Sequence, residues 1–341
     1  MYTALLAVAL LIGCLLAVQA SANLQLNKAV GTPYGASTIQ LALATGLLAV
    51  LALAVGALGA LGRLPEATGW HLLGGLASPF YITCGILLFP RLGAVASVGL
   101  FVAGQMFASL GLDLLGLLGV ERRPLDAGMV IGAVAVLVGI VVIIQGQKRA
   151  AATAVPAPAP AAAAVGDRGA GGSPAPPPAP APGGGAPSGV GRVGWILLGI
   201  LAGAVLPVQG AVNARLRGEL GEPLAVALVS FTVATATIVA VLLVLYTTGR
   251  TPRPRLAPLR SMPWWGWLGA ACAAGYVTGT FLAIPVIGAA VTIALTVTGQ
   301  QLTSAAIDHY GLFRMPRRPM NVPRVTGLVL LLAGSLAIQL L

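Results

Sequence analysis

The stretch Leu206–Pro223 reads LPVQGAVNARLRGELGEP, and Leu16–Pro33, which lies 190 residues earlier, reads LAVQASANLQLNKAVGTP. Aligned without a gap, the two phrases share leucine, valine, glutamine, asparagine, leucine, glycine and proline at seven positions. Each phrase places polar amides inside an apolar run. A polar phrase of this length that occurs twice in one chain indicates an internal repeat.

The repeat continues toward the end of each half of the chain. If five extra residues are allowed in the loop before the third apolar segment of the second half, the offset becomes 195 residues. The residues that then match are Trp70 and Trp265, Gly74 and Gly269, Tyr81 and Tyr276, Pro90 and Pro285, Gly104-Gln105 and Gly299-Gln300, Asp113 and Asp308, RRP at 122–124 and 317–319, and Gly132 and Gly327. Matches in register across so much of both halves indicate a duplication.

The composition is that of a protein embedded in a lipid bilayer. The chain has 341 residues, of which 57% are hydrophobic and 8% are charged, and its mean hydropathy is +0.95. A soluble domain carries about 25% charged residues. The net charge of +11 comes from basic residues in short loops between apolar runs, which is typical of loops that face anionic lipid. We therefore expect an integral membrane protein and no nucleic-acid partner.

A membrane-spanning helix needs roughly 20 mainly apolar residues. By that rule we expect ten spans, at residues 2–24, 34–60, 70–89, 91–112, 127–146, 194–214, 223–247, 264–284, 286–308 and 323–341. The expected units are a first five-helix repeat at 1–149, a disordered tether rich in proline, alanine and glycine at 150–191, and a second repeat at 192–341.

An odd number of spans places the second repeat upside down relative to the first. The expected fold is therefore an all-α membrane protein built from two inverted repeats. Of the 19 lysines and arginines, 14 fall on the side of the tether and 5 on the opposite side. The excess of positive charge in cytoplasmic loops predicts a cytoplasmic tether and both chain ends outside.

Three stretches of the second half resemble a known family. They are LPVQGAVNARLRGELGEPLAVALVSF, TGQQLTSAAIDHYGL and RRPMNVPRVTGLVLLLAG, and the first half keeps VQASAN, GQMFASLGLD and ERRP. They resemble the YdcZ-like family of bacterial inner-membrane proteins, which belongs to the drug/metabolite transporter superfamily alongside EamA-type permeases. Members are commonly single five-helix units, so this chain resembles a fused pair. The resemblance implies transport of small molecules across the bacterial inner membrane.

The related small multidrug resistance proteins carry a mid-membrane glutamate in their first helix. Here the comparable place in both repeats is occupied by neutral residues around Gln19 and Gln209. This difference favours an uncharged or zwitterionic substrate, or coupling of transport through Asp308.

Two amide pairs stand at helical spacing in the repeated phrase. Gln19 and Asn23 are four residues apart, as are Gln209 and Asn213, so each pair shares one face of a helix. Because an amide facing lipid would lose its hydrogen bonds, these side chains must face protein or a watery cavity. They either contact a substrate or hold helices together by hydrogen bonds worth about 0.6–2 kcal/mol each.

Further candidates lie on the fourth and third helices of each repeat. Gln105 and Gln300 each follow a glycine that lets a neighbouring helix approach closely, and Gln301 adds to an unusually polar ninth helix. We expect these glutamines to line a cavity or to join helices. Tyr81 and Tyr276 could stack on a planar substrate or pack in the interior.

Two carboxylates recur near a membrane face. Asp113 and Asp308 are candidates for a proton or cation site, and His309 beside Asp308 could relay protons in the second half. Both aspartates, however, fall at helix ends shortly before the RRP loops. A salt bridge or a helix cap against those arginines would explain them without a role in transport.

These features favour a secondary transporter that alternates access between its inverted repeats. The alternative from another class is a membrane scaffold or accessory subunit with no translocation path. We find no metal motif, catalytic triad or phosphate-binding loop, so we expect neither an enzyme nor a bound cofactor or metal. The expected partners are a small-molecule substrate and lipid, and the chain would act as a monomer or homodimer.

Overall fold

The computed structural model describes residues 2–120, 122, 124–153, 189–287 and 289–340, and within them the chain forms helices and connections without a strand. The predicted tether at 150–191 lies mostly outside these residues. The α-helices are α1 (Tyr2–Val30), α2 (Pro33–Ala54), α3 (Ala77–Leu92), α4 (Ala94–Leu115), α5 (Ala127–Thr153), α6 (Gly189–Leu220), α7 (Pro223–Thr247), α8 (Leu268–Ile287), α9 (Ala289–Tyr310) and α10 (Val322–Leu340). Short 3-10 helices are η1 (Ala57–Glu66), η2 (Gly69–Leu76), η3 (Leu117–Gly119), η4 (Ala257–Ser261), η5 (Trp264–Trp267) and η6 (Leu312–Arg314).

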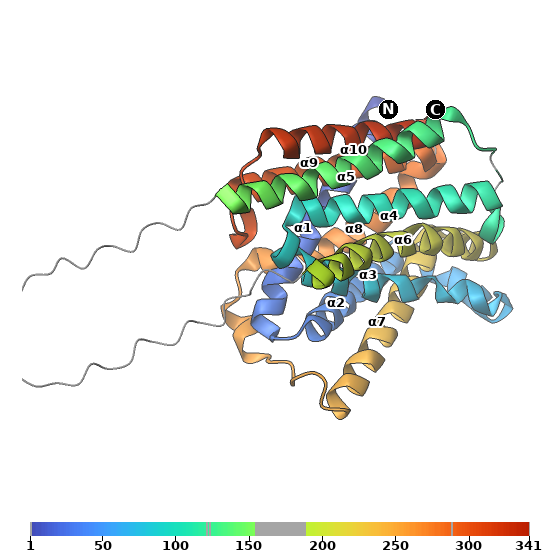
Figure 1. Ribbon diagram of the computed structural model, residues 1–341. Coiled ribbons are helices and arrows are strands. Elements are labelled where there is room, and N and C mark those ends of the chain that lie inside the picture. Colours follow the sequence, from blue (N-terminus) through green and yellow to red (C-terminus); the bar gives the residue numbers. More distant parts are fainter. Residues whose placement is uncertain (1, 121, 123, 154–188, 288, 341) are drawn as a thin grey trace, which may run out of the picture.

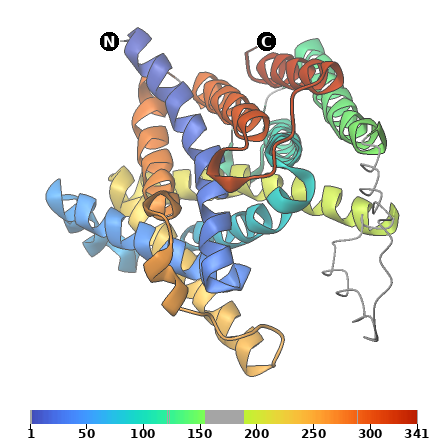
Figure 2. The same ribbon diagram turned by 90° about the vertical axis from the view of Figure 1, so that its left-hand side faces the viewer.

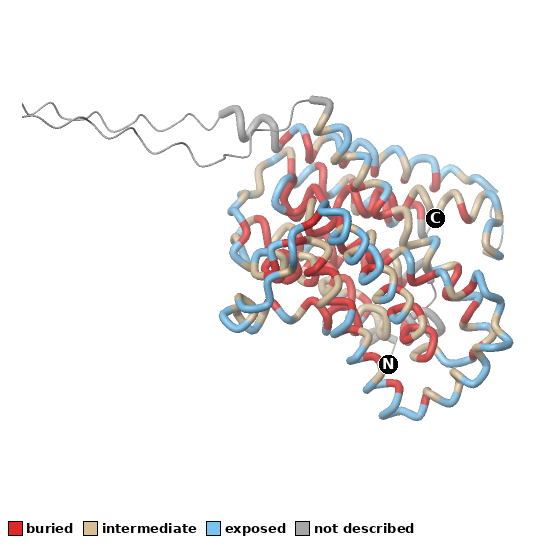
Figure 3. Tube along the Cα trace, turned by 90° about the horizontal axis from the view of Figure 1, so that it is seen from below, coloured by how far each residue is buried: buried red, intermediate tan, exposed pale blue. Residues whose placement is uncertain are grey.

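Seven helical segments among the described residues are long and apolar enough to cross a membrane. They are Leu6–Val30, Pro33–Ala54, Gly69–Leu92, Ala94–Leu115, Ala127–Gly146, Gly191–Leu220 and Pro223–Thr247, and Val322–Ile338 is a shorter apolar helix. The polar side chains of α9, among them Gln300, Gln301 and Asp308, lower its hydropathy. The outer surface is apolar: Leu53, Ile131 and Val322 are 67%, 65% and 78% exposed. Buried residues gather on the inward sides of the helices (Figure 3), so the protein presents hydrocarbon to its surroundings, as a membrane protein must.

The end of the repeated phrase forms the corner between two helices in each half. Gly31 and Gly221 adopt φ angles of 84° and 77°, a left-handed conformation that suits glycine and ends α1 and α6. Pro33 and Pro223 then stand in the first turn of α2 and α7, where a proline costs no helical hydrogen bond. The shared glycine and proline thus make the same turn twice.

The second expected span ends earlier than the sequence suggested. The span predicted at 34–60 stops at Ala54, because Gly56 takes a left-handed φ of 75° and the chain continues as η1. The third span begins with η2 before the α-helical geometry of α3 starts at Ala77. In the second half η5 precedes α8 in the same way.

Close helix crossings occur in matched pairs. A Cβ on Gly104 of α4 would collide with the carbonyl oxygen of Ile200 on α6, and a Cβ on its repeat mate Gly299 of α9 would collide with that of Leu10 on α1. Figures 1 and 2 both show α5 and α10 side by side. There Gly132 approaches the carbonyl oxygen of Gly334, and Gly139 approaches that of Gly327. Gly327 is the repeat mate of Gly132, and Gly334 is the repeat mate of Gly139. The contacts therefore persist when the two halves are exchanged.

Contacts near the ends of α1 and α6 are matched in the same way. Gln25 near the end of α1 donates to the carbonyl oxygen of Phe313 at 2.7 Å, and its mate Arg215 near the end of α6 donates to that of Leu118 at 3.1 Å. Leu118 and Phe313 have φ angles of 52° and 54°, which cost a residue with a Cβ roughly 1–2 kcal/mol. The same strained turn, held by the same contact, thus follows α4 and α9.

Candidate functional site

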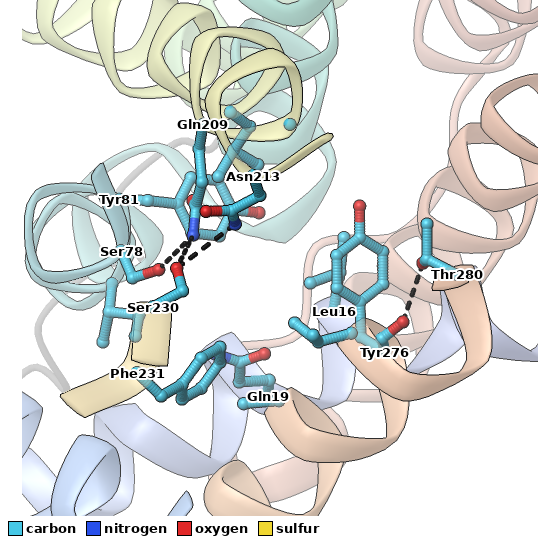
Figure 4. Close-up of a pocket in the computed structure, with 15 residues that line it drawn as sticks. Leu16, Gln19, Ser78, Tyr81, Gln209, Asn213, Ser230, Phe231, Tyr276 and Thr280 are labelled. Atoms are coloured by element: carbon cyan, nitrogen blue, oxygen red, sulfur yellow. Dashed lines mark hydrogen bonds between the residues drawn. The ribbon is translucent and has the colours of Figure 1, made fainter. Parts of the chain in front are cut away.

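The main cavity lies where α1, α3, α6, α7 and α8 meet. It has a volume of about 130 Å³. It is lined by Leu16, Gln19, Ser78, Tyr81, Ile82, Leu206, Gln209, Gly210, Asn213, Ser230, Phe231, Ala273, Tyr276, Val277 and Thr280. Figure 4 shows these side chains around the hollow.

Both halves of the chain contribute equivalent residues to this cavity. The repeat mates that line it together are Leu16 and Leu206, Gln19 and Gln209, Ser78 and Ala273, Tyr81 and Tyr276, and Ile82 and Val277. A cavity lined by such pairs lies on the boundary between the two repeats. Four predicted residues, Gln19, Gln209, Tyr81 and Tyr276, meet there.

The amides of α6 belong to a hydrogen-bond cluster in the cavity wall. The Nε2 atom of Gln209 donates to Ser78 Oγ at 2.9 Å and to Ser230 Oγ at 3.4 Å, and Asn213 Nδ2 donates to Ser230 Oγ at 3.2 Å (Figure 4). The Oδ1 atom of Asn213 is buried and has no hydrogen-bond partner among the described residues. The cluster joins α3, α6 and α7 and leaves one strong acceptor unused.

The amides of α1 are placed differently. Gln19 lines the cavity with a side chain that is 4% exposed, and its Oε1 atom lacks a partner within the described part of the chain. Asn23 does not line the cavity; it lies against Gly269 in a small cleft that has no room for water. Gln40, which occupies the repeat position of Ser230, fills that cleft and donates to the carbonyl oxygen of Gly269 at 3.3 Å. In the other half, the shorter side chain of Ser230 lines the open cavity instead.

The tyrosines form aromatic walls. Tyr81 is 7% exposed, packs against Phe101 with ring centroids 4.9 Å apart, and accepts a hydrogen bond from Gln300 Nε2 at 3.2 Å through its hydroxyl oxygen. Gln300 therefore reaches the cavity indirectly, through Tyr81. Tyr276 is half-buried, and its backbone oxygen accepts from the hydroxyl of Thr280 at 2.7 Å.

Two predicted glutamines lie away from the cavity lining. Gln105 is 8% exposed and Gln301 is fully buried. The Nε2 atom of each has no hydrogen-bond partner in the described ranges. Gln301 lies close to Gly99 on α4, in the contact between α4 and α9.

The cavity also includes polar residues that sequence reasoning missed. Ser78, Ser230 and Thr280 contribute hydroxyls, and Phe231 contributes a ring. Ser230 interrupts the apolar run LAVALVSF of α7, so an isolated hydroxyl in a membrane helix was the available signal. Ser78 lacks a polar mate, since Ala273 occupies its position in the second half.

Asp308 lies outside the cavity in a fully buried charged cluster. Its carboxylate accepts hydrogen bonds from the backbone amides of Ala94 at 2.8 Å and Val95 at 3.2 Å, at the N-terminus of α4. It also forms an ion pair of 2.5 Å with Arg324 of α10, which is not one of the arginines of the RRP loops. Asp308 thus joins α9, α10 and α4.

The other two candidates for ion coupling stand in different surroundings. Asp113 is partly exposed, and the repeat position of Arg324 is occupied by Met129. The Nδ1 atom of His309 accepts a hydrogen bond from the backbone amide of Met320 at 3.3 Å, and its ring packs against Tyr310. His309 therefore supports the loop after α9 rather than the Asp308 carboxylate.

Comparison with known proteins points to one family. The family model described as "Putative inner membrane exporter, YdcZ" matches residues 4–142 and again residues 194–337. None of the curated proteins compared with the chain matches it in sequence. The two matched stretches are the two repeats, and together they cover most of the chain. The chain therefore belongs to the YdcZ family of the drug/metabolite transporters, as two family units in one polypeptide.

Proposed function

We propose that the chain is a secondary transporter that moves small molecules across the bacterial inner membrane by alternating access between two inverted five-helix repeats. The substrate would bind in the cavity between α1, α3, α6, α7 and α8. One observation carries the proposal: the repeat mates Gln19 and Gln209, and Tyr81 and Tyr276, line one hollow. Transporters built from inverted repeats place the substrate at such a boundary.

Equivalent contacts made by the two halves of the chain support the inverted arrangement. Gln25 contacts the turn after α9 at one end of the bundle, and Arg215 makes the equivalent contact after α4. In Figure 1 the described ends of α5 and α6 that flank the tether lie toward the left, whereas both chain ends lie toward the right. With ten spans, the excess of basic residues on the tether side places that side in the cytoplasm.

The asymmetry of the cavity fits one of two states of such a transporter. Asn213 and Ser230 line the cavity, whereas their mates Asn23 and Gln40 pack into a closed cleft. Inverted repeats reach the opposite state by exchanging their conformations. In that state Asn23 and Gln40 would line the hollow, and Asn213 would be packed away.

Asp308 fits a structural role within this transporter. Its carboxylate already has three partners, and it joins α9 and α10 of the second repeat to the start of α4 in the first. We assign this cluster to holding the two repeats together on the tether side.

The experiment compares two matched cysteines in a chain whose own cysteines have been replaced. Asn213→Cys and Asn23→Cys occupy equivalent repeat positions, and Val136→Cys in the fully buried contact of α5 with α10 is the control. In sealed vesicles, a transporter should expose Asn213→Cys to a charged thiol reagent from outside and Asn23→Cys from the cytoplasmic side. Protection of both cysteines from both sides, as for the control, would instead support a scaffold without a translocation path.

A further inference from the structure

Among the residues that the structure describes, tyrosine is the only ionisable type that lines the cavity. None of its lining residues is an aspartate, glutamate, lysine, arginine or histidine. The buried ion pair of Asp308 with Arg324 lies elsewhere and is already balanced. A charged solute entering this hollow would lose its hydration and find no countercharge, which is costly in a membrane interior. The lining therefore favours an uncharged solute.

Two acceptors in the wall are buried and unused. They are Gln19 Oε1 from the first repeat and Asn213 Oδ1 from the second, and neither has a partner among the residues that the structure describes. Both atoms are covered by protein, and Asn213 Oδ1 lies against Gly74 of η2. Figure 4 shows Asn213 and Gln19 on opposite sides of the hollow. An acceptor that is buried without a hydrogen bond carries a desolvation penalty. N–H groups on a solute would supply the missing hydrogen bonds when the two amides turn toward the hollow.

The shape and size of the cavity narrow the class of solute further. The rings of Tyr81, Tyr276 and Phe231 line the hollow, and Tyr81 is held by Phe101 and Gln300. Fixed aromatic faces favour a flat partner. The volume of about 130 Å³ is well below the several hundred Å³ of pockets that hold drug-sized ligands. The hollow fits a solute with a single ring.

Resting on the proposed function, we propose that the substrate is a small, uncharged, planar molecule that carries N–H donors, in the chemical class of single-ring heterocyclic amides. Gln19 and Asn213, with their amides turned toward the hollow, accept its N–H groups from opposite repeats, and the aromatic faces pack against its ring. The neutral amides and hydroxyls of the wall reject charged analogues of the same size.

A matched set of probes tests this class on the full chain. Nicotinamide is neutral and carries N–H donors, nicotinate is its anionic analogue, 1-methylnicotinamide is its cationic analogue, and N,N-dimethylnicotinamide lacks the N–H donors. Uracil is a second neutral member. Thermal stabilisation of the purified protein and uptake into proteoliposomes are the measurements. We expect nicotinamide or uracil to bind and to be taken up, and the two ions and the dimethylamide to bind at least about tenfold more weakly.

A substitution that introduces a negative charge into the cavity tests the site through a gain of cation binding. Gln19→Glu places a carboxylate in the cavity wall and should shift preference from nicotinamide toward 1-methylnicotinamide. Gln145→Glu makes the same change at an exposed position on α5 and should leave the preference unchanged. A gain of cation binding only in the Gln19 variant supports the site and its neutral selectivity together.

A wrong substrate class can be distinguished from a wrong proposed function. If only an ion of the set is taken up, or if none of the probes is taken up while Asn213→Cys and Asn23→Cys react from opposite sides, the substrate class is wrong and the transporter stands. If none is taken up and both cysteines are protected from both sides, the proposed function falls, and this inference with it.

Discussion

The hydroxyl oxygens of Thr45 on α2 and Thr235 on α7 lie 2.8 Å apart, and these two residues occupy the same position in the two repeats. Each of the two threonines thus contacts its own repeat mate. Thr45 also donates to the carbonyl oxygens of Leu41 and Phe231. The two halves therefore meet through equivalent positions in the contact of α2 with α7.

This contact predicts a crosslink between the halves. In a cysteine-free chain with a protease site inserted between residues 160 and 180, Thr45→Cys with Thr235→Cys should form a disulfide on oxidation, because the two side-chain ends already touch. After cleavage, the halves should migrate together on a non-reducing gel and separate on reduction. The control pair is Thr45→Cys with Thr237→Cys, since the Thr237 hydroxyl bonds to its own helix at Val233. Crosslinking of both pairs to the same extent would contradict the contact.

The ion pair of Asp308 with Arg324 predicts a large loss of stability when one partner is removed. Both side chains are buried, so Asp308→Asn leaves an uncompensated arginine and should cost about 3–5 kcal/mol. The measurement is thermal unfolding in detergent. Asp113→Asn, at the partly exposed repeat mate, is the control and should cost much less.

The double variant Asp308→Asn with Arg324→Met tests whether the charges act as a pair. It introduces the methionine that the first repeat has at Met129, and it removes both charges at once. Replacing both partners of a buried pair is often far less costly than removing one. Recovery of much of the lost stability is expected, and strictly additive losses would rule out the pairing.

Much of this arrangement was predictable from the repeat, and the exceptions have local causes. Gln19 with Gln209 and Tyr81 with Tyr276 meet as their matched positions suggested. The exclusion of Asn23 was not predictable, because matched positions in the two halves do not say which pair packs into the closed cleft with Gln40 and which lines the open cavity with Ser230.

The ion-pair partner of Asp308, Arg324, was also not predicted, because it too depends on how helices pack. Sequence proximity pointed to the arginines of the RRP loop, but the loop carries the chain on to α10, whose first turn brings Arg324 to the carboxylate. Which of several nearby arginines reaches a buried acid depends on how α10 packs, and a linear pattern does not contain that information.

The glycine contacts predict opposite effects for two substitutions on one helix. A Cβ on Gly104 would collide with the backbone of Ile200, so Gly104→Ala should force α4 and α6 apart and cost roughly 1–3 kcal/mol. Gly111 on the same helix has open space around its Cβ position, and Gly111→Ala should be neutral or stabilising by up to about 1 kcal/mol. Thermal unfolding of the two variants provides the comparison. Equal destabilisation by both would contradict the assignment of the cost to the crossing of α4 with α6.

The bond from Gln300 to Tyr81 predicts a binding defect that its repeat mate should not share. Gln300→Leu removes the donor that holds the Tyr81 hydroxyl, and a hydrogen bond worth about 0.5–1.5 kcal/mol corresponds to a roughly two- to tenfold loss of affinity. Gln105→Leu removes a buried amide whose Nε2 has no partner within the described residues, so nicotinamide affinity should be retained.

Combining Gln300→Leu with Tyr81→Phe separates positioning from direct contact with the solute. If Gln300 acts through Tyr81, the double variant should bind nicotinamide about as weakly as the Tyr81 single variant, because the hydroxyl that Gln300 holds is already gone. The affinities from thermal stabilisation of the three proteins provide the cycle. Fully additive losses would mean that Gln300 meets the solute by itself, and the cavity would then have to extend toward α9 beyond the residues that line it here.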